Sequence, residues 1–337
     1  MKRLCVALAA TMLLFAPEAG AQAGRVDTGK AVTSNAISAQ MASYGQWLQR
    51  LTAAQMVGLS ELQSLRDKWQ NVAQATRPIV IISFRAEIAK ARAAMLRSDE
   101  LIRALDRPKF PLLDLAPDLL PDALIGHMLK TSANALELVD SFGPMLDAML
   151  ARDGKAADRA ALKLLDAAKL LVDSQALLGT AMMATIDKDT AQYDAMQFDM
   201  LLYRSAARLI DAAGVTMRGG TQPEFHGDME RIAAEIDGII ARGTEKVEAA
   251  IADAKAELDE EEGDSAMALL LRKSIEMDEL ERRSFTTARA FAAALRALPK
   301  GAVSFAHIQQ ALNAVRIARE AMDAISTAQN DVLAREG

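Results

Sequence analysis

Apolar residues recur every three or four positions along most of this chain. The first long stripe consists of Tyr44, Leu48, Leu51, Gln55, Gly58, Leu62, Leu65, Trp69 and Val72. Because an α-helix has 3.6 residues per turn, this spacing places all of these side chains on one face. Gln55 and Gly58 are the weak points of the stripe. No strand-like alternation competes with the helical period, so we predict an all-α protein.

Glycine and proline breaks divide the chain into about eight helical segments. Proline fits the first turn of a helix, so Arg77-Pro78 separates the first helix from a second that extends to about Asp106. The other helices are expected at about 122–153, 156–187, 189–215, 228–258, 265–298 and from 304 onward. Short connections imply antiparallel neighbours. We therefore predict an elongated antiparallel helical bundle of about eight helices.

Several local features refine this picture. Gly143-Pro144 should kink or split the third helix. The helix at 156–187 is apolar over a wide arc and is expected at the centre. Asp228 and Ser304 are expected to cap the sixth and eighth helices. The acidic run at 259–264 lacks the ligand spacing of a calcium loop and is expected to be a solvated turn.

A proline-rich connection interrupts the helices at 107–121, where Pro108, Pro111, Pro117 and Pro121 stand. No long helix can pass through four prolines. The segment is rich in leucine, so it is either a buried crossover or an exposed binding loop, and the crossover is favoured because exposed leucines are costly. It separates a long helical hairpin at 24–106 from a helical bundle at 122–337. The inner stripes on both sides could share one core.

The first residues match a secretory signal peptide. Met1-Lys2-Arg3 is a basic start, and an uncharged, mostly apolar stretch follows from Leu4 to Ala16. Ala21-Gln22-Ala23 then supplies the small-x-small pattern of a cleavage site. The apolar stretch is shorter than the roughly 20 residues of a membrane span. We predict that residues 1–23 are a cleaved signal peptide.

Composition indicates the compartment and restricts the partners. Cys5, the only cysteine, leaves with the signal, so the mature chain can form neither a disulfide nor a cysteine metal site. No Asn-x-Ser/Thr sequon occurs, which would be unusual for a eukaryotic secreted protein without disulfides. The expected location is therefore periplasmic or secreted. The net charge of −6 and the lack of a dense basic run argue against a nucleic-acid partner.

No motif for catalysis or metal binding appears. None of the three histidines, His127, His226 and His307, has the glutamate three residues earlier that a metal site between helices uses. Phosphate-binding loops, nucleophile elbows and His-Glu-x-x-His are absent. The densest polar constellation is Glu224, His226, Asp228 and Glu230.

A metal could use the constellation at 224–230, but a loop that enters the acidic first turn of a helix explains it better. We assign no catalytic, cofactor-binding or metal-binding residue, and we leave open whether these four residues bind a metal. His127 is expected at the boundary of the core and His307 at the surface.

Three classes of function remain after these exclusions. The favoured one is an exported interaction or scaffold protein without catalytic activity, since long apolar stripes can pair between chains as well as within one. Its partner would be another protein or a second copy. The second is a membrane-active protein that inserts the apolar hairpin at 161–203 into lipid, although Asp166 and Asp173 oppose this. The third is a binder of a small ligand between helices.

Overall fold

The computed structural model describes residues 33–73, 78–113, 115, 117–183, 186–261 and 265–334. These residues form α-helices and one 3₁₀ turn, without a strand, which confirms the all-α prediction. The elements are α2 (Thr33–Ala73), α3 (Pro78–Ala104), η1 (Pro117–Leu119), α4 (Pro121–Ala151), α5 (Gly154–Met183), α6 (Ala191–Met217), α7 (Phe225–Glu260), α8 (Ala266–Arg296) and α9 (Phe305–Ala334). The expected signal peptide at 1–23 lies outside the described residues.

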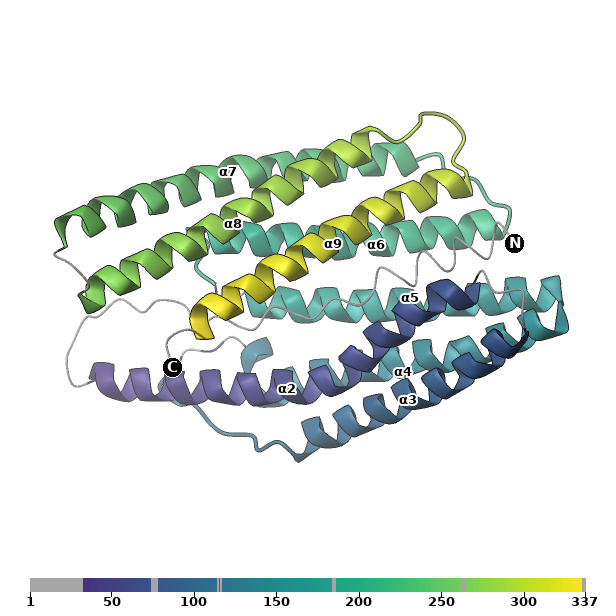
Figure 1. Cartoon of the computed structure of the whole chain (residues 1–337), viewed down its shortest axis with the longest axis horizontal. Helices are drawn as coiled ribbons and strands as arrows, with labels where there is room; N and C mark the ends of the chain where they lie inside the picture. The colour runs from purple at the N-terminus through teal and green to yellow at the C-terminus, as the bar shows by residue number, and fades with distance from the viewer. Residues whose placement is uncertain are drawn as a thin grey trace.

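Each α-helix packs against the next one in the chain, and Figure 1 shows them lying side by side. α6 contacts more α-helices than any other described helix, namely α5, α7, α8 and α9. Of its residues only Arg204 and Asp211 are exposed. The central helix is therefore α6. The prediction that the preceding helix is central was wrong, since Leu170 and Leu177 on α5 are exposed.

The buried apolar side chains form two clusters of unequal size. The larger one, called the main core here, contains residues of all eight α-helices, from Leu59 of α2 to Ala318 of α9. Trp69 of α2 is fully buried in it, with its ring centroid 5.2 Å from that of Phe84 and 4.9 Å from that of Phe142. The smaller one, called the end core, consists of Tyr44, Trp47, Leu51, Ala54, Ile102, Leu124, Ile125, Met128 and Leu178.

The proline-rich connection lies against the end core. Leu119 is buried, and its carbonyl accepts a hydrogen bond of 2.8 Å from the Tyr44 hydroxyl. Leu113 and Leu115 are half-buried against the same cluster. Leu112 and Leu120 nevertheless remain exposed. The favoured prediction, a buried crossover, is therefore correct for only some of the leucines in this segment.

Two expectations about helix boundaries were wrong, a split of the third helix at Pro144 and a cap at Asp228. α4 continues through Pro144 without a split and ends at Ala151, where Arg152 adopts a left-handed conformation with φ 53°. α7 begins at Phe225, so Asp228 lies in its first turn and does not cap it. Helix caps depend on backbone geometry within one turn, which the spacing of apolar residues leaves undetermined.

Two glycines mark close approaches between helices. A Cβ atom built on Gly58 of α2 would lie 3.2 Å from the Met95 Cα of α3. A Cβ atom on Gly243 of α7 would lie 2.1 Å from Cζ of Phe285, a buried ring of α8. A buried aromatic ring has little room to move, so this contact allows only glycine without a shift of the two helices.

The contact at Gly243 predicts opposite effects for two substitutions in one helix. We expect Gly243→Ala to lower the free energy of unfolding by about 1–3 kcal/mol, because the methyl group overlaps the Phe285 ring. Gly238→Ala serves as the matched control, since its nearest contact would be 3.6 Å from an arginine side chain. Alanine there should stabilise by up to ~1 kcal/mol through helix propensity. Urea unfolding measures both, and equal effects would contradict the packing described.

Candidate functional site

In the structure, the residues of the constellation at 224–230 contact different partners and do not converge. The contacts are His226 Nε2 with the Gly301 carbonyl at 3.0 Å, Asp228 with Arg208 and Arg231, and Glu230 with Arg296 at 3.7 Å. Glu224 is exposed. Within the described ranges, no three His, Cys, Asp or Glu side chains gather closely enough to hold a metal ion. These residues tie the start of α7 to α6, to α8 and to the α8–α9 connection.

The two other histidines occupy boundary positions. His127 on α4 is half-buried, and its Nε2 lies 3.8 Å from Oδ1 of Asp118 in η1. His307 is also half-buried rather than fully exposed, and its Nδ1 accepts a hydrogen bond of 3.4 Å from the Ser304 N–H group. Ser304 therefore stands directly before α9, as expected, with its backbone bonded to the first turn of the helix.

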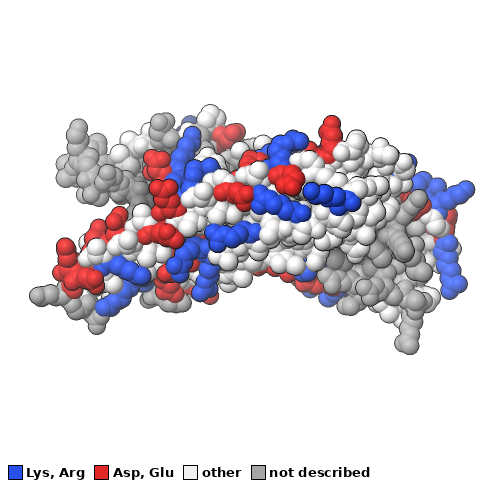
Figure 2. Space-filling view, turned by 90° about the horizontal axis from the view of Figure 1, so that it is seen from above, with Lys and Arg blue, Asp and Glu red and all other residues white. Residues whose placement is uncertain are grey.

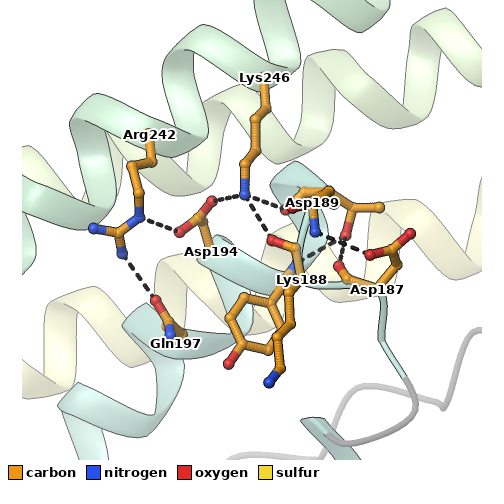
Figure 3. A network of polar contacts seen from close by, with 9 residues as sticks. Asp187, Lys188, Asp189, Asp194, Gln197, Arg242 and Lys246 are labelled. Carbon is orange, nitrogen blue, oxygen red and sulfur yellow. Dashed lines mark hydrogen bonds and ion pairs between the residues drawn. The ribbon is translucent and has the colours of Figure 1, made fainter.

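The most enclosed charged group is the Asp194 carboxylate in the first turn of α6, at 1% exposure. Two cations of α7 hold it (Figure 3): Arg242 Nε lies 3.2 Å from Oδ1, and Lys246 Nζ lies 2.7 Å from Oδ2. Lys246 also donates to the carbonyls of Lys188 and Thr190, at 2.8 and 3.4 Å. Because Arg242 and Lys246 are four residues apart, they leave the same face of α7.

The groups around Asp194 complete this network. The Thr190 hydroxyl caps α6 by accepting a hydrogen bond of 3.3 Å from the Tyr193 N–H group. Arg242 donates a second hydrogen bond, 3.0 Å long, to the side chain of Gln197. Both carboxylate oxygens of Asp194 have cationic partners, so the group is neither a free base nor a nucleophile. The arrangement clamps the start of α6 to α7.

The clamp predicts a large loss of stability when the carboxylate is neutralised. We expect Asp194→Asn to lower the free energy of unfolding by about 2–4 kcal/mol, because the negative charge that pairs with both cations is lost and the amide oxygen can accept from only one of them. Glu235→Gln is the matched control, because the Arg204–Glu235 pair joins the same two helices at 3.1 Å but is exposed. That variant should change the value by less than about 1 kcal/mol. Similar losses for both would rule out the clamp.

A second buried cation, Arg319, joins α9 to α6. Its guanidinium bonds to Asp199, donates a hydrogen bond of 3.0 Å to the Tyr203 hydroxyl, and lies 4.4 Å from the centroid of the Tyr203 ring. Asp323, one turn further along α9, is 3.8 Å away. Burial opposes the charge on Arg319, but these neighbours outweigh burial and raise its pKa above the ordinary value. The residue is therefore a permanently charged link between helices.

Two carboxyl groups have pKa values near neutrality. Burial raises the pKa of Glu281 on α8 to about 8, and the negative charge of Asp278 adds to this. Burial also raises the pKa of Asp323 to about 7, although Arg319 and Arg66 oppose the shift. Such groups can serve as general acids or bases. Because their pKa values differ from the ordinary ones, both groups make the stability of the fold depend on pH.

The raised pKa of Glu281 sets the sign of a pH effect. Between about pH 4.5 and 8 the folded chain keeps a proton on Glu281 that the unfolded chain has released, so stability falls as the pH rises through this window. Glu281→Gln removes this dependence. From pH 6 to pH 8, we expect the wild-type protein to lose about 2 kcal/mol of unfolding free energy relative to the variant. Parallel pH profiles for the two proteins would contradict the shift.

A shallow hollow of about 210 Å³ lies between α8 and α9. Its lining residues are Glu276, Glu279, Leu280, Arg283, Ala328 and Asp331. Pockets for small organic ligands are mostly apolar with a few polar groups, whereas four of these six side chains are charged. The hollow therefore gives little support to the third class of function.

Large apolar side chains are exposed at the end of the α7–α8 hairpin. We call this end, residues 257–261 and 265–270, the α7–α8 tip. Three large apolar side chains near the start of α8, Met267, Leu269 and Leu270, are at least half exposed. Across the turn, α7 ends in exposed acidic residues: Glu257, Asp259, Glu260 and Glu261. Figure 2 shows Asp and Glu side chains gathered at this end of the molecule.

The tip projects because α7 extends beyond the point where its neighbour α6 begins. Lys246 of α7 already contacts the residues that precede α6, and α7 continues for fourteen residues to Glu260. At 1.5 Å per residue this adds roughly 20 Å. On the other side, the end of α9 packs near Leu280 through Val332, ten residues beyond Leu270 along α8. Neither helix therefore covers the apolar side chains of the tip.

Sequence reasoning missed this tip, since it treated the acidic run only as a turn. The available signal was Met267-Ala268-Leu269-Leu270-Leu271, an apolar run that no helical stripe can bury completely. None of the described helices is long and apolar enough to cross a membrane. No family model matches the chain, and neither the curated proteins nor the solved structures include a match.

Proposed function

We propose that the protein is an exported, non-catalytic interaction protein, an elongated antiparallel helical bundle that binds a protein partner through the α7–α8 tip. The signal-like residues 1–23 and the absence of cysteine from the mature chain support a periplasmic or secreted location. The observation that carries the proposal is the exposure of Met267, Leu269 and Leu270 within one helical turn. Contiguous exposed apolar side chains mark interaction sites more often than isolated ones do.

The chemistry of the tip restricts its partner. Burial of one exposed leucine on binding contributes about 1.5–3 kcal/mol, so three such side chains can anchor a specific contact. The acidic residues around them favour a partner segment that carries lysine or arginine beside its apolar residues. Pairing of two copies through their tips would bring like charges together. We therefore infer a different protein as the partner.

The two other classes have weaker support. The hairpin at 161–203 exposes Leu170 and Leu177 on α5, but Asp166 and Asp173 alternate with them on the same exposed face. Insertion into lipid would carry these carboxylates into the apolar phase at a cost of about 2.5–3.5 kcal/mol each. The hollow between α8 and α9 is open and lined mostly by charged side chains, so it offers a small ligand little apolar surface.

A site-specific crosslinking experiment tests the proposal. A photoreactive phenylalanine analogue replaces Leu270 in one variant and Ile317 in another; both side chains are 54% exposed, but Ile317 stands alone on α9. In the native cell envelope, position 270 should give a discrete crosslinked band and position 317 should not. If irradiation gives the same yield of crosslinked product at both positions, or no product at either, the assignment is overturned.

Substitution at the tip then measures the energetics. We expect Leu270→Ser to weaken capture of the crosslinked partner at least about tenfold, because burial of one leucine is lost. Ile317→Ser should leave capture unchanged. Capture should also weaken with rising salt if basic groups of the partner meet the acidic residues of the tip.

A further inference from the structure

The two apolar cores are separated at one level by polar residues. On each of the helices α2 to α5, the buried residues between the end core and the main core include polar ones: Gln55, Ser98, Thr131, Ser132, Ser174 and Gln175. We call this set the polar layer. It contains every buried polar side chain of the described parts of these four helices. A polar interruption at one level of four helices is not the pattern of a continuous core.

Direct contacts fix the layer across α2 and α3. The Ser98 hydroxyl of α3 donates a hydrogen bond of 2.8 Å to the Ala54 carbonyl of α2 and lies 3.3 Å from the Gln55 carbonyl. Gly58 allows this approach, since its missing side chain leaves room for Met95. The hydroxyls of Thr131 and Ser174 donate to carbonyls of their own helices, four and three residues earlier.

Three atoms of the two amide side chains in the layer lack partners. Gln55 is 3% exposed and its Nε2 has no hydrogen-bond partner, and Gln175 is 1% exposed with neither Nε2 nor Oε1 bonded. A buried donor or acceptor without a partner costs about 1–3 kcal/mol. Water could satisfy all three atoms if the helices separated at this level. The unpartnered atoms therefore raise the free energy of the closed state, and opening at this level removes that cost.

The end core is also the smaller of the two clusters. It gathers the start of α2, the end of α3, the start of α4 and the end of α5. Trp47 Nε1 donates a hydrogen bond of 2.9 Å to the Asp106 carbonyl, and the Leu112 N–H group donates one of 2.9 Å to Gln40. With the bond from Tyr44 to Leu119, these contacts link the end core to the proline-rich connection and to Asp106 just before it.

We propose that the end core opens as a separate cooperative unit, with the polar layer as its boundary, while the main core stays folded. Proteins open in such sub-global units when a region has few buried contacts relative to the rest. Opening exposes the end core and hydrates Gln55 and Gln175. It requires no change in the helices α6 to α9, which contribute nothing to the end core.

The chain contains two tryptophans, and each lies in a different core, which allows a direct test. Trp69→Phe leaves Trp47 as the reporter of the end core, and Trp47→Phe leaves Trp69 as the reporter of the main core. In urea, the fluorescence midpoint of Trp47 should lie about 1 M below that of Trp69. Coincident midpoints would overturn the proposal.

A second measurement avoids substitution of the reporters. Native-state hydrogen exchange of the wild-type protein should show the amides at 44–54 and 124–128 exchanging through one common opening, faster than those at 59–72 by at least about tenfold. Equal protection of the two groups would again exclude separate opening. This measurement decides the matter even if a tryptophan variant fails to fold.

Variants of the polar layer test the cause. Gln55→Leu combined with Gln175→Leu removes the unpartnered amide atoms and joins the two cores, so the two tryptophan midpoints should converge. Gln49→Leu is the control, since Gln49 lies on the same helix α2 but is exposed, and it should leave the separation unchanged. If the double variant keeps the midpoints apart, the polar layer is not the boundary.

Discussion

The Asp194 carboxylate is the constraint on which the packing of the central helix depends. α6 is almost fully enclosed, so any charge on its inner side must find a partner inside the protein or destabilise the fold. Arg242 and Lys246 supply that partner from adjacent turns of α7. The same lysine holds the carbonyls that precede α6. One side chain thus fixes where α6 begins and which face of α7 it meets.

Buried polar groups divide the molecule into two halves of different character. Among α6 to α9, the cation Arg319 is paired with Asp199 and Tyr203 across helices, and such links hold their register because breaking one leaves an uncompensated charge. Among α2 to α5, the buried polar groups are neutral, and Gln55 and Gln175 stay unbonded. A neutral amide can leave the interior at little cost, whereas a buried ion pair cannot.

The helices themselves could be predicted because glycine and proline interrupt the apolar period at nearly every boundary. The buried ion pairs of Asp194 could not be predicted, since an acidic residue in the first turn of a helix is equally well explained by its favourable interaction with the helix dipole. The exposure of Leu170 also escaped prediction, because a wide apolar arc does not say how many neighbours will cover it. Gln55 was visible as a weak point in its stripe, but its alignment with Gln175 depends on register between helices, which one sequence does not contain.

The end core and the α7–α8 tip belong to the same end of the molecule, since α2 begins, α5 ends and α7 ends toward the left of Figure 1. Two groups of contacts lie along the chain between them. Leu178 near the end of α5 belongs to the end core, and Lys246 of α7 binds the Lys188 and Thr190 carbonyls in the connection that follows α5.

Contiguity alone does not create coupling; a partner must bind the open and closed states with different affinity. The tip lies on α7 and α8, which the opening leaves in place, so its apolar side chains are equally available in both states. A difference in the partner's affinity for the two states therefore requires that opening moves the end of α5 and the α5–α6 connection. That movement would shift Lys246, which binds the carbonyls of this connection. Without that displacement, the two ends of this path remain energetically independent.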